Sequence, residues 1–177
     1  WYVPRNAAVV VAGDVAPAKV LALAQKTYGA IPPRAVPARK PRTEPVQQGL
    51  RRIDFKAPAE QAYVALAFHV PGISRIEDMG DSDRDGLALL VLSAVLSGYD
   101  GARLERALTQ GADRVADAAD SQASVFGRGP SLFLLTGVPA TGKTGQQVED
   151  ALRAEIARVA REGVSEAELS RVKTQWA

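Results

Sequence analysis

Residues 61–70 read QAYVALAFHV, and their strict alternation decides the fold class. Successive side chains of an extended strand point to opposite faces, so alternation of this kind predicts a half-buried strand. One face carries Val64, Leu66, Phe68 and Val70, and the other carries Tyr63, Ala65, Ala67 and His69. Residues 50–56, LRRIDFK, alternate in the same way. Only the short segment APAE separates the two runs, which predicts an antiparallel hairpin.

Strands and helices are expected on both sides of this hairpin. Further strands are predicted at residues 6–15, 115–126 and 131–137. One helix is predicted to begin at Pro17, and two more are predicted over residues 81–98 and 101–109. A fourth helix is predicted to end at Gly163, and a fifth to follow the capping box Ser165-x-x-Glu168. The resulting order, β-α-β-β-α-α-β-β-α-α, favours an α+β fold. We expect a two-layer sandwich in which helices cover a mostly antiparallel sheet.

Composition excludes several classes of function. The 177 residues fit one domain, so residues 1–177 are predicted to form a single domain. A net charge of +2 from 22 basic and 20 acidic residues, with few aromatic residues, predicts no nucleic-acid partner. The chain has no cysteine and therefore no disulfide or thiolate metal site. Its longest apolar run, residues 86–98, is too short to span a membrane.

A short motif in residues 135–145, LTGVPATGKTG, suggests a nucleotide site. Gly137, Gly142, Lys143 and Thr144 match the G-x-x-x-x-G-K-[ST] pattern, whose backbone amides and lysine hold phosphates. That site also needs parallel strands and a second acidic residue for magnesium, and the sequence predicts neither. The alternative is a turn in which Gly142 gives flexibility and Thr144 begins a helix. The nucleotide site is kept as a distant alternative.

Two further patterns suggest metal or catalytic chemistry. Asp81, Asp83 and Asp85 with Gly86 match the first half of a calcium-binding loop, but Leu92 stands where the bidentate glutamate should be. These carboxylates also suit the N-terminus of a helix. His69 is the only histidine, which cannot form a zinc site of the inverted His-x-x-Glu-His type. The sequence therefore predicts no catalytic residue and no metal ligand, and places His69 on a face that could be concave.

Several longer stretches, in order along the whole chain, resemble one family. They are WYVPRNAAVVVAGDV with the proline-started helix and AIPPR, then AFHVPG, VLSGYDGARLERALTQ, RGPSLFLLTGVPATGKT and GVSEAELSRVKTQ. Together they are similar to the second domain of insulinase/pitrilysin-type zinc metallopeptidases, the relatives of mitochondrial processing peptidase. Such peptidases pair two similar α+β domains around an unfolded peptide, and only the first domain binds zinc.

The resemblance implies the zinc-free, C-terminal half of a longer bacterial peptidase, cut at both ends. Its expected role is to form the wall of the substrate chamber and an interface with other domains. Expected partners are an N-terminal catalytic domain of the same protein, which would bind the zinc, a homologous partner subunit, and a peptide substrate. The fragment alone would have no peptidase activity. Bacterial relatives suggest a periplasmic or cell-envelope location.

One departure from the family pattern concerns substrate binding. In many relatives the zinc-free domain supplies an arginine and, seven residues later, a tyrosine that grip the substrate backbone. The aligned positions here are Thr109 and Ala116, which offer neither a guanidinium nor a phenol. We expect either a zinc-bearing subunit whose partner supplies the gripping pair, or a scaffold subunit that has lost proteolysis.

Overall fold

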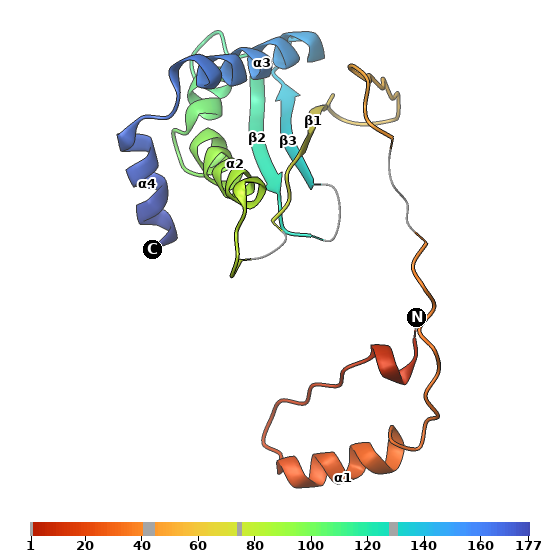
Figure 1. Ribbon diagram of the computed structural model, residues 1–177. Helices are drawn as coiled ribbons and strands as arrows, with labels where there is room; N and C mark the ends of the chain where they lie inside the picture. The colour runs from red at the N-terminus through yellow and green to blue at the C-terminus, as the bar shows by residue number, and fades with distance from the viewer. Residues whose placement is uncertain (1, 41–44, 74–75, 128–130) are drawn as a thin grey trace. The chain divides into compact units, whose positions relative to one another are not determined.

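The computed structural model describes residues 2–40, 45–73, 76–127 and 131–177. The chain divides into two compact units, residues 1–54 and 55–177, and each is described by itself (Figure 1). The prediction of a single domain over the whole chain stays a prediction.

In its described residues, the first unit contains one α-helix and one short 3₁₀ turn. The turn η1 spans Pro4–Asn6, and the helix α1 spans Pro17–Thr27 with the expected proline in its first turn. The prediction of a strand at residues 6–15 is wrong for this structure. Residues 7–12 form no strand ladder, and the side chain of Val10 is 90% exposed. A strand is defined by hydrogen bonds to a neighbouring strand, and the first unit forms no such pairing in its described residues.

The second unit is built on a three-stranded sheet. Its strands are β1 (Val64–Val70), β2 (Ala116–Ser124) and β3 (Ser131–Pro139). Their order is β1-β3-β2, and both pairings are antiparallel. This confirms the predicted α+β class with an antiparallel sheet. The predicted hairpin is wrong, because β1 pairs with β3 and residues 50–56 form no strand. The side chain of Ile53 is 89% exposed, so its burial does not stabilise a strand at residues 50–56.

Two long helices follow the sheet strands in the expected places. α2 spans Asp81–Ser97 and ends at Gly98, and α3 spans Gly145–Glu162 and ends at Gly163. A capping box opens α3: the amide of Gln147 donates to the Thr144 hydroxyl, and the Thr144 amide donates to the Gln147 side chain. The short element η2 (Glu105–Thr109) is a π-helical turn, where an α-helical turn is the sequence expectation.

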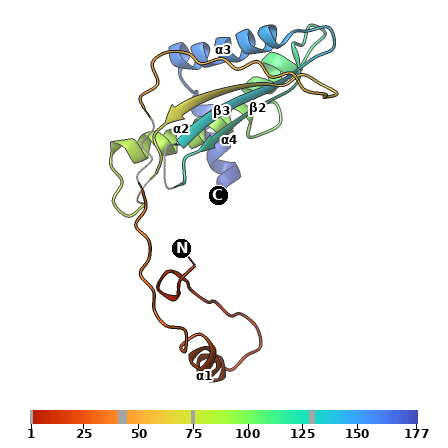
Figure 2. The ribbon, with the colours of Figure 1, turned by 90° about the vertical axis from the view of Figure 1, so that its right-hand side faces the viewer.

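The helices α2 and α3 cover the same face of the sheet. Ser121 of β2 bonds through its hydroxyl to Ser93 and Ser97 of α2. A Cβ atom at Gly137 of β3 would lie 2.6 Å from Cγ1 of Val148 in α3, so this glycine lets the helix approach closely. Figure 2 shows the strands in front of α2 and α4. The core between these layers consists of Leu96, Leu104, Leu108, Ala116, Phe133, Leu135, Val148 and Leu152.

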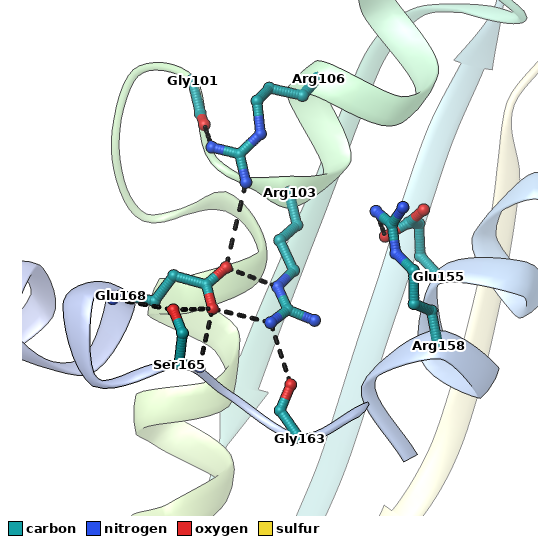
Figure 3. Close-up of polar contacts among 8 residues, drawn as sticks. All are labelled: Gly101, Arg103, Arg106, Glu155, Arg158, Gly163, Ser165 and Glu168. Carbon is teal, nitrogen blue, oxygen red and sulfur yellow. Dashed lines mark hydrogen bonds and ion pairs between the residues drawn. The ribbon is translucent and has the colours of Figure 1, made fainter. Parts of the chain in front are cut away.

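The last helix, α4 (Glu166–Trp176), is fixed by a buried ion pair (Figure 3). Arg103 donates from Nε and Nη2 to the two carboxylate oxygens of Glu168, at 2.6 and 2.7 Å, and from Nη2 to the Gly163 carbonyl at 3.0 Å. The side chains are only 10% and 14% exposed. The hydrogen bond from Arg103, together with weaker contributions from the bonds of Ser165, lowers the pKa of Glu168 to about 2 against the opposing effect of burial. Glu168 thus both caps α4 and connects it to the segment after α2.

Candidate functional site

The face of the sheet that points away from α2 and α3 is a candidate surface of the second unit. Residues directly opposite each other in an antiparallel sheet point to the same side, so the register defines this face. We call it the open face: Ala65, Ala67 and His69 of β1; Leu132, Leu134, Thr136 and Val138 of β3; Ala118, Asp120, Gln122 and Ser124 of β2. Along β3 the buried residues all belong to the helix-covered side, and those of the open face are half-buried. The open face is therefore apolar at its centre, with small side chains along β1.

His69 lies on this face, as its place in the alternating run predicts. It is exposed and lies opposite Leu132 of β3. Ser124 of β2 lies opposite the same leucine, on the other side of β3. Two strand spacings separate His69 from Ser124, about 10 Å, which is too far for a hydrogen bond. Ser124 therefore cannot act as a catalytic partner of His69 across the described sheet, and the exposed position of His69 suits contact with a bound chain.

The two positions that align with the gripping pair lie at the other edge of the sheet. The hydroxyl of Thr109 donates to the Glu105 carbonyl at 3.0 Å within η2, and Ala116 is fully buried at the start of β2. The nearby arginines are engaged elsewhere. Arg106 donates to the Gly101 carbonyl, and Arg114 pairs with Asp117 at 3.1 Å. Neither pairs with a tyrosine in the arrangement that relatives use.

A hollow of about 390 Å³ lies beside these positions. We call it the acidic pocket; its lining is Ser97, Gly98, Tyr99, Asp100, Ala102, Glu105, Thr109, Asp117, Ala118 and Ala119. Three of these residues are acidic and none is basic. The pocket combines the end of α2, the turn η2 and the edge of β2, which are separate in the sequence. Sequence analysis missed it because no local spacing connects these segments.

A second hollow, about 210 Å³, lies on the helix-covered side between β1 and α3. Its lining is mainly apolar and includes Leu66, Phe68, Ile156 and Ala160. Its one charged lining residue is Arg153, which pairs with Glu149, so the lining offers no set of acid, base and nucleophile.

The phosphate-binding motif lies in a different structural setting from that of a phosphate loop. Gly137 lies within β3, which has an antiparallel neighbour on each side, whereas a phosphate loop follows a strand of a parallel sheet. The Lys143 amide donates to the Ala140 carbonyl at 2.9 Å, which closes a turn after the strand. Thr144 caps α3. The turn interpretation therefore accounts for the motif, and the nucleotide alternative gains no support.

The calcium-like motif is the first turn of α2. The side chain of Asp83 accepts a hydrogen bond from the Gly80 amide at 3.0 Å, and Gly86 is buried against Ile73. A helix cannot wrap its side chains around an ion as a calcium loop does. Within the described residues, no group of three or more histidine, aspartate or glutamate side chains could hold a metal ion. Among the same residues, no helix is both long and apolar enough to cross a membrane.

Comparison with known proteins places this geometry in a family. The family model described as the peptidase M16 inactive domain matches residues 1–176. The chain belongs to the peptidase M16 family. This confirms the resemblance to the inactive domain of insulinase/pitrilysin-type peptidases. No curated protein sequence matches the chain at a significant level.

A solved structure, a protease from Helicobacter pylori, has the same fold as this M16 domain. The TM-score is 0.74 at 24% sequence identity, over 93% of this chain and 38% of that protein. At this identity the likeness shows the fold alone. The chain thus spans well under half the length of the protease that it matches.

Proposed function

We propose that this chain is the non-catalytic domain of a zinc-dependent endopeptidase and that its open face forms part of the substrate chamber. The observation that carries the proposal is the open face itself, in a chain that belongs to the inactive domain of a peptidase family. The open face, with Ala65 and Ala67 along one strand and leucines at its centre, gives an extended peptide a smooth, partly apolar surface. It contains no acid–base pair of its own.

In this proposal, another domain of the parent protein binds the zinc. Zinc would activate water there, and the present chain would hold and orient the peptide while restricting access of solvent. The substrate contacts of this chain would come from small and apolar side chains, with His69 as the one imidazole on the surface. The chain alone is expected to cleave no peptide.

Site-specific photo-crosslinking tests the proposal. A photoreactive residue at Ala67, on the open face, should crosslink to an unfolded peptide added to the full-length parent protein. The matched control is Ala154, an exposed alanine on α3. Equal crosslinking at both positions, or at the control alone, would refute the chamber-wall role. Thermal unfolding of both variants checks that the fold is kept.

The positions of Thr109 and Ala116 also support a partner subunit that supplies the gripping pair. In this version the parent protein binds zinc but needs a homologous subunit for full activity. The competing role is a scaffold that has lost proteolysis. A His-x-x-Glu-His motif in the parent, with activity that rises when the partner is added, supports the first version. A parent without that motif supports the scaffold, and full activity as a purified monomer contradicts both.

A further inference from the structure

We propose that residues 6–28 form a strand–helix unit of another domain of the parent protein, packed on the edge of that domain's sheet. The inference goes beyond the substrate role of the open face, and it shares with the proposed function only the premise of a longer parent protein. Its starting point is the distribution of buried residues. Those that the structure describes as buried all lie between Ile73 and Val172, so none of them belongs to the first unit.

Residues 7–12 of the first unit have the composition of a buried strand. They read AAVVVA, six consecutive apolar residues, and the structure shows all of them exposed and outside any strand ladder. Val9, Val10 and Val11 are β-branched, and such residues favour strands whose side chains pack against neighbours. Because the run is apolar at every position rather than at alternate ones, both of its faces suit burial, as in a strand that is covered on both sides. In this chain alone the run gains none of that burial.

The helix α1 likewise has an apolar face without a core. It has 11 residues, and isolated helices shorter than about 12–15 residues are only marginally stable in water. Helices in proteins are stabilised mainly by the packing of one apolar face. In α1 that face consists of Val20, Leu21, Ala24 and the following Tyr28. None of the four is buried, and the side chains of Leu21 and Tyr28 are more than half exposed.

The apolar run and the helix are already connected as a strand–helix unit requires. Gly13 follows the run with a φ of 146°, a value that favours glycine. The amide of Val15 donates to the Gly13 carbonyl at 2.9 Å, which closes a tight turn. Pro17 then begins α1. A strand, a short turn and a helix in this order are a building unit of layered domains, and such a unit is stable only when it packs on further elements.

Another domain of the parent protein suits this unit better as a host than the second unit does. The core of the second unit is formed by its own residues, and α2 and α3 already cover one side of its sheet. A strand added beside β1 would bury one of its faces under those helices and leave the other on the open face. The solved protease with the same fold leaves room for a further domain, since this chain spans only 38% of it. We expect the host to offer a free strand edge for the amides and carbonyls of residues 7–12, and an apolar surface for α1.

This assignment moves the boundary of the non-catalytic domain within the chain. The domain would comprise the second unit alone, and residues 29–54 would connect it to the host domain. The described residues of this connection form no helix or strand. Pro32, Pro33 and Pro37 favour an extended, semi-rigid spacer, and the exposed Arg34 keeps it hydrated.

Hydrogen exchange followed by mass spectrometry tests the assignment, on this chain alone and on the full-length parent protein. We expect the amides of residues 7–12 and of α1 to exchange at least about tenfold more slowly in the parent, because packing on the host sheet protects them. Peptides from β3 should exchange at similar rates in both proteins.

A matched pair of substitutions adds a second measurement. The variants are Val10→Asp and Val46→Asp, at valines whose side chains are 90% and 86% exposed in this chain. Val10→Asp should lower the Tm of the first unfolding transition of the parent by at least about 4 °C, because it places a charge in the host's core. It should leave the Tm of this chain alone unchanged. Val46→Asp lies in the connection and should change neither Tm.

Three results would overturn the inference. Equal exchange of residues 7–12 in both proteins would refute the host domain. Slow exchange of these residues in this chain alone, or a lower Tm of this chain with Val10→Asp, would place them on the second unit or on a second copy of the chain. Equal effects of the two substitutions on the parent would show that the position of the charge does not matter. The photo-crosslinking test of the open face does not depend on residues 6–28, so the proposed function stands or fails separately.

Discussion

Replacing Glu168 by glutamine tests whether one buried ion pair fixes α4. Glutamine keeps the shape and can preserve the capping box, so the change mainly removes charge. The pKa of Glu168 is lowered from 4.5 to about 2, first by its hydrogen bond to Arg103 and also by the bonds from Ser165. At about 1.4 kcal/mol per pKa unit, this corresponds to a stabilisation of about 3 kcal/mol at neutral pH. We therefore expect Glu168→Gln to lower the free energy of unfolding by about 2–3 kcal/mol.

The pH dependence of that loss gives a sharper test. A carboxyl group whose pKa is lower in the folded protein stabilises it above the unfolded pKa, and the effect declines as pH falls from about 4.5 towards about 2. Urea unfolding of both proteins at pH 7 and pH 3 should show the difference between them falling by about half or more. The control Glu162→Gln removes an exposed pair with Arg161, 3.7 Å long, and should cost less than about 0.5 kcal/mol. A loss no larger than the control's, or one that is the same at both pH values, would refute the reasoning.

Further substitutions test the packing and the turn after β3. Gly137→Ala places a Cβ 2.6 Å from Val148, so we expect about 1–3 kcal/mol of destabilisation by urea unfolding, and Val148→Ala in the same protein should recover part of it. Leu152→Ala empties a fully buried site and should cost about 2–5 kcal/mol; a smaller loss would mean that the site collapses around the alanine. Thr144→Ala removes the cap of α3 and should lower the Tm, at a cost of about 1 kcal/mol, whereas Lys143→Ala should leave the Tm unchanged with or without magnesium and ATP. A shift of the Tm by ATP that Lys143→Ala abolishes would restore the nucleotide interpretation.

Local patterns were sufficient to predict most elements of the second unit. Alternation over residues 61–70 predicted β1 and its two faces, and stop signals at Gly163 and Ser165 separated α3 from α4. Strand pairing could not be predicted in the same way. β1 pairs with β3, which is remote in sequence, and such a choice depends on which surfaces the sheet buries together. A hairpin prediction based on a short connection assumes that neighbours in sequence pair, and here they do not.

The candidate site, too, could be predicted only in part from local patterns. His69 and the small residues of β1 were assigned to one face from the alternation alone, and the register confirms that they share it. The acidic pocket was invisible in the sequence, because Asp100, Glu105 and Asp117 meet only after α2, η2 and β2 have packed. The π-helical form of η2 was equally hidden, since nothing in residues 105–109 distinguishes it from an α-helical turn.

The phosphate-loop motif shows why a correct pattern can carry no function. Three of the four defining residues serve this fold, each for a separate reason. Gly137 allows α3 to approach the sheet, and Gly142 adopts a φ of 78°, a left-handed conformation that favours glycine. Thr144 caps the following helix, and only the backbone of Lys143 takes part in the turn. A strand, a tight turn and a capped helix thus produce the same residue pattern as a nucleotide site. What distinguishes the two is the sheet, since the antiparallel neighbours of β3 leave no crossover that would build the rest of a nucleotide site.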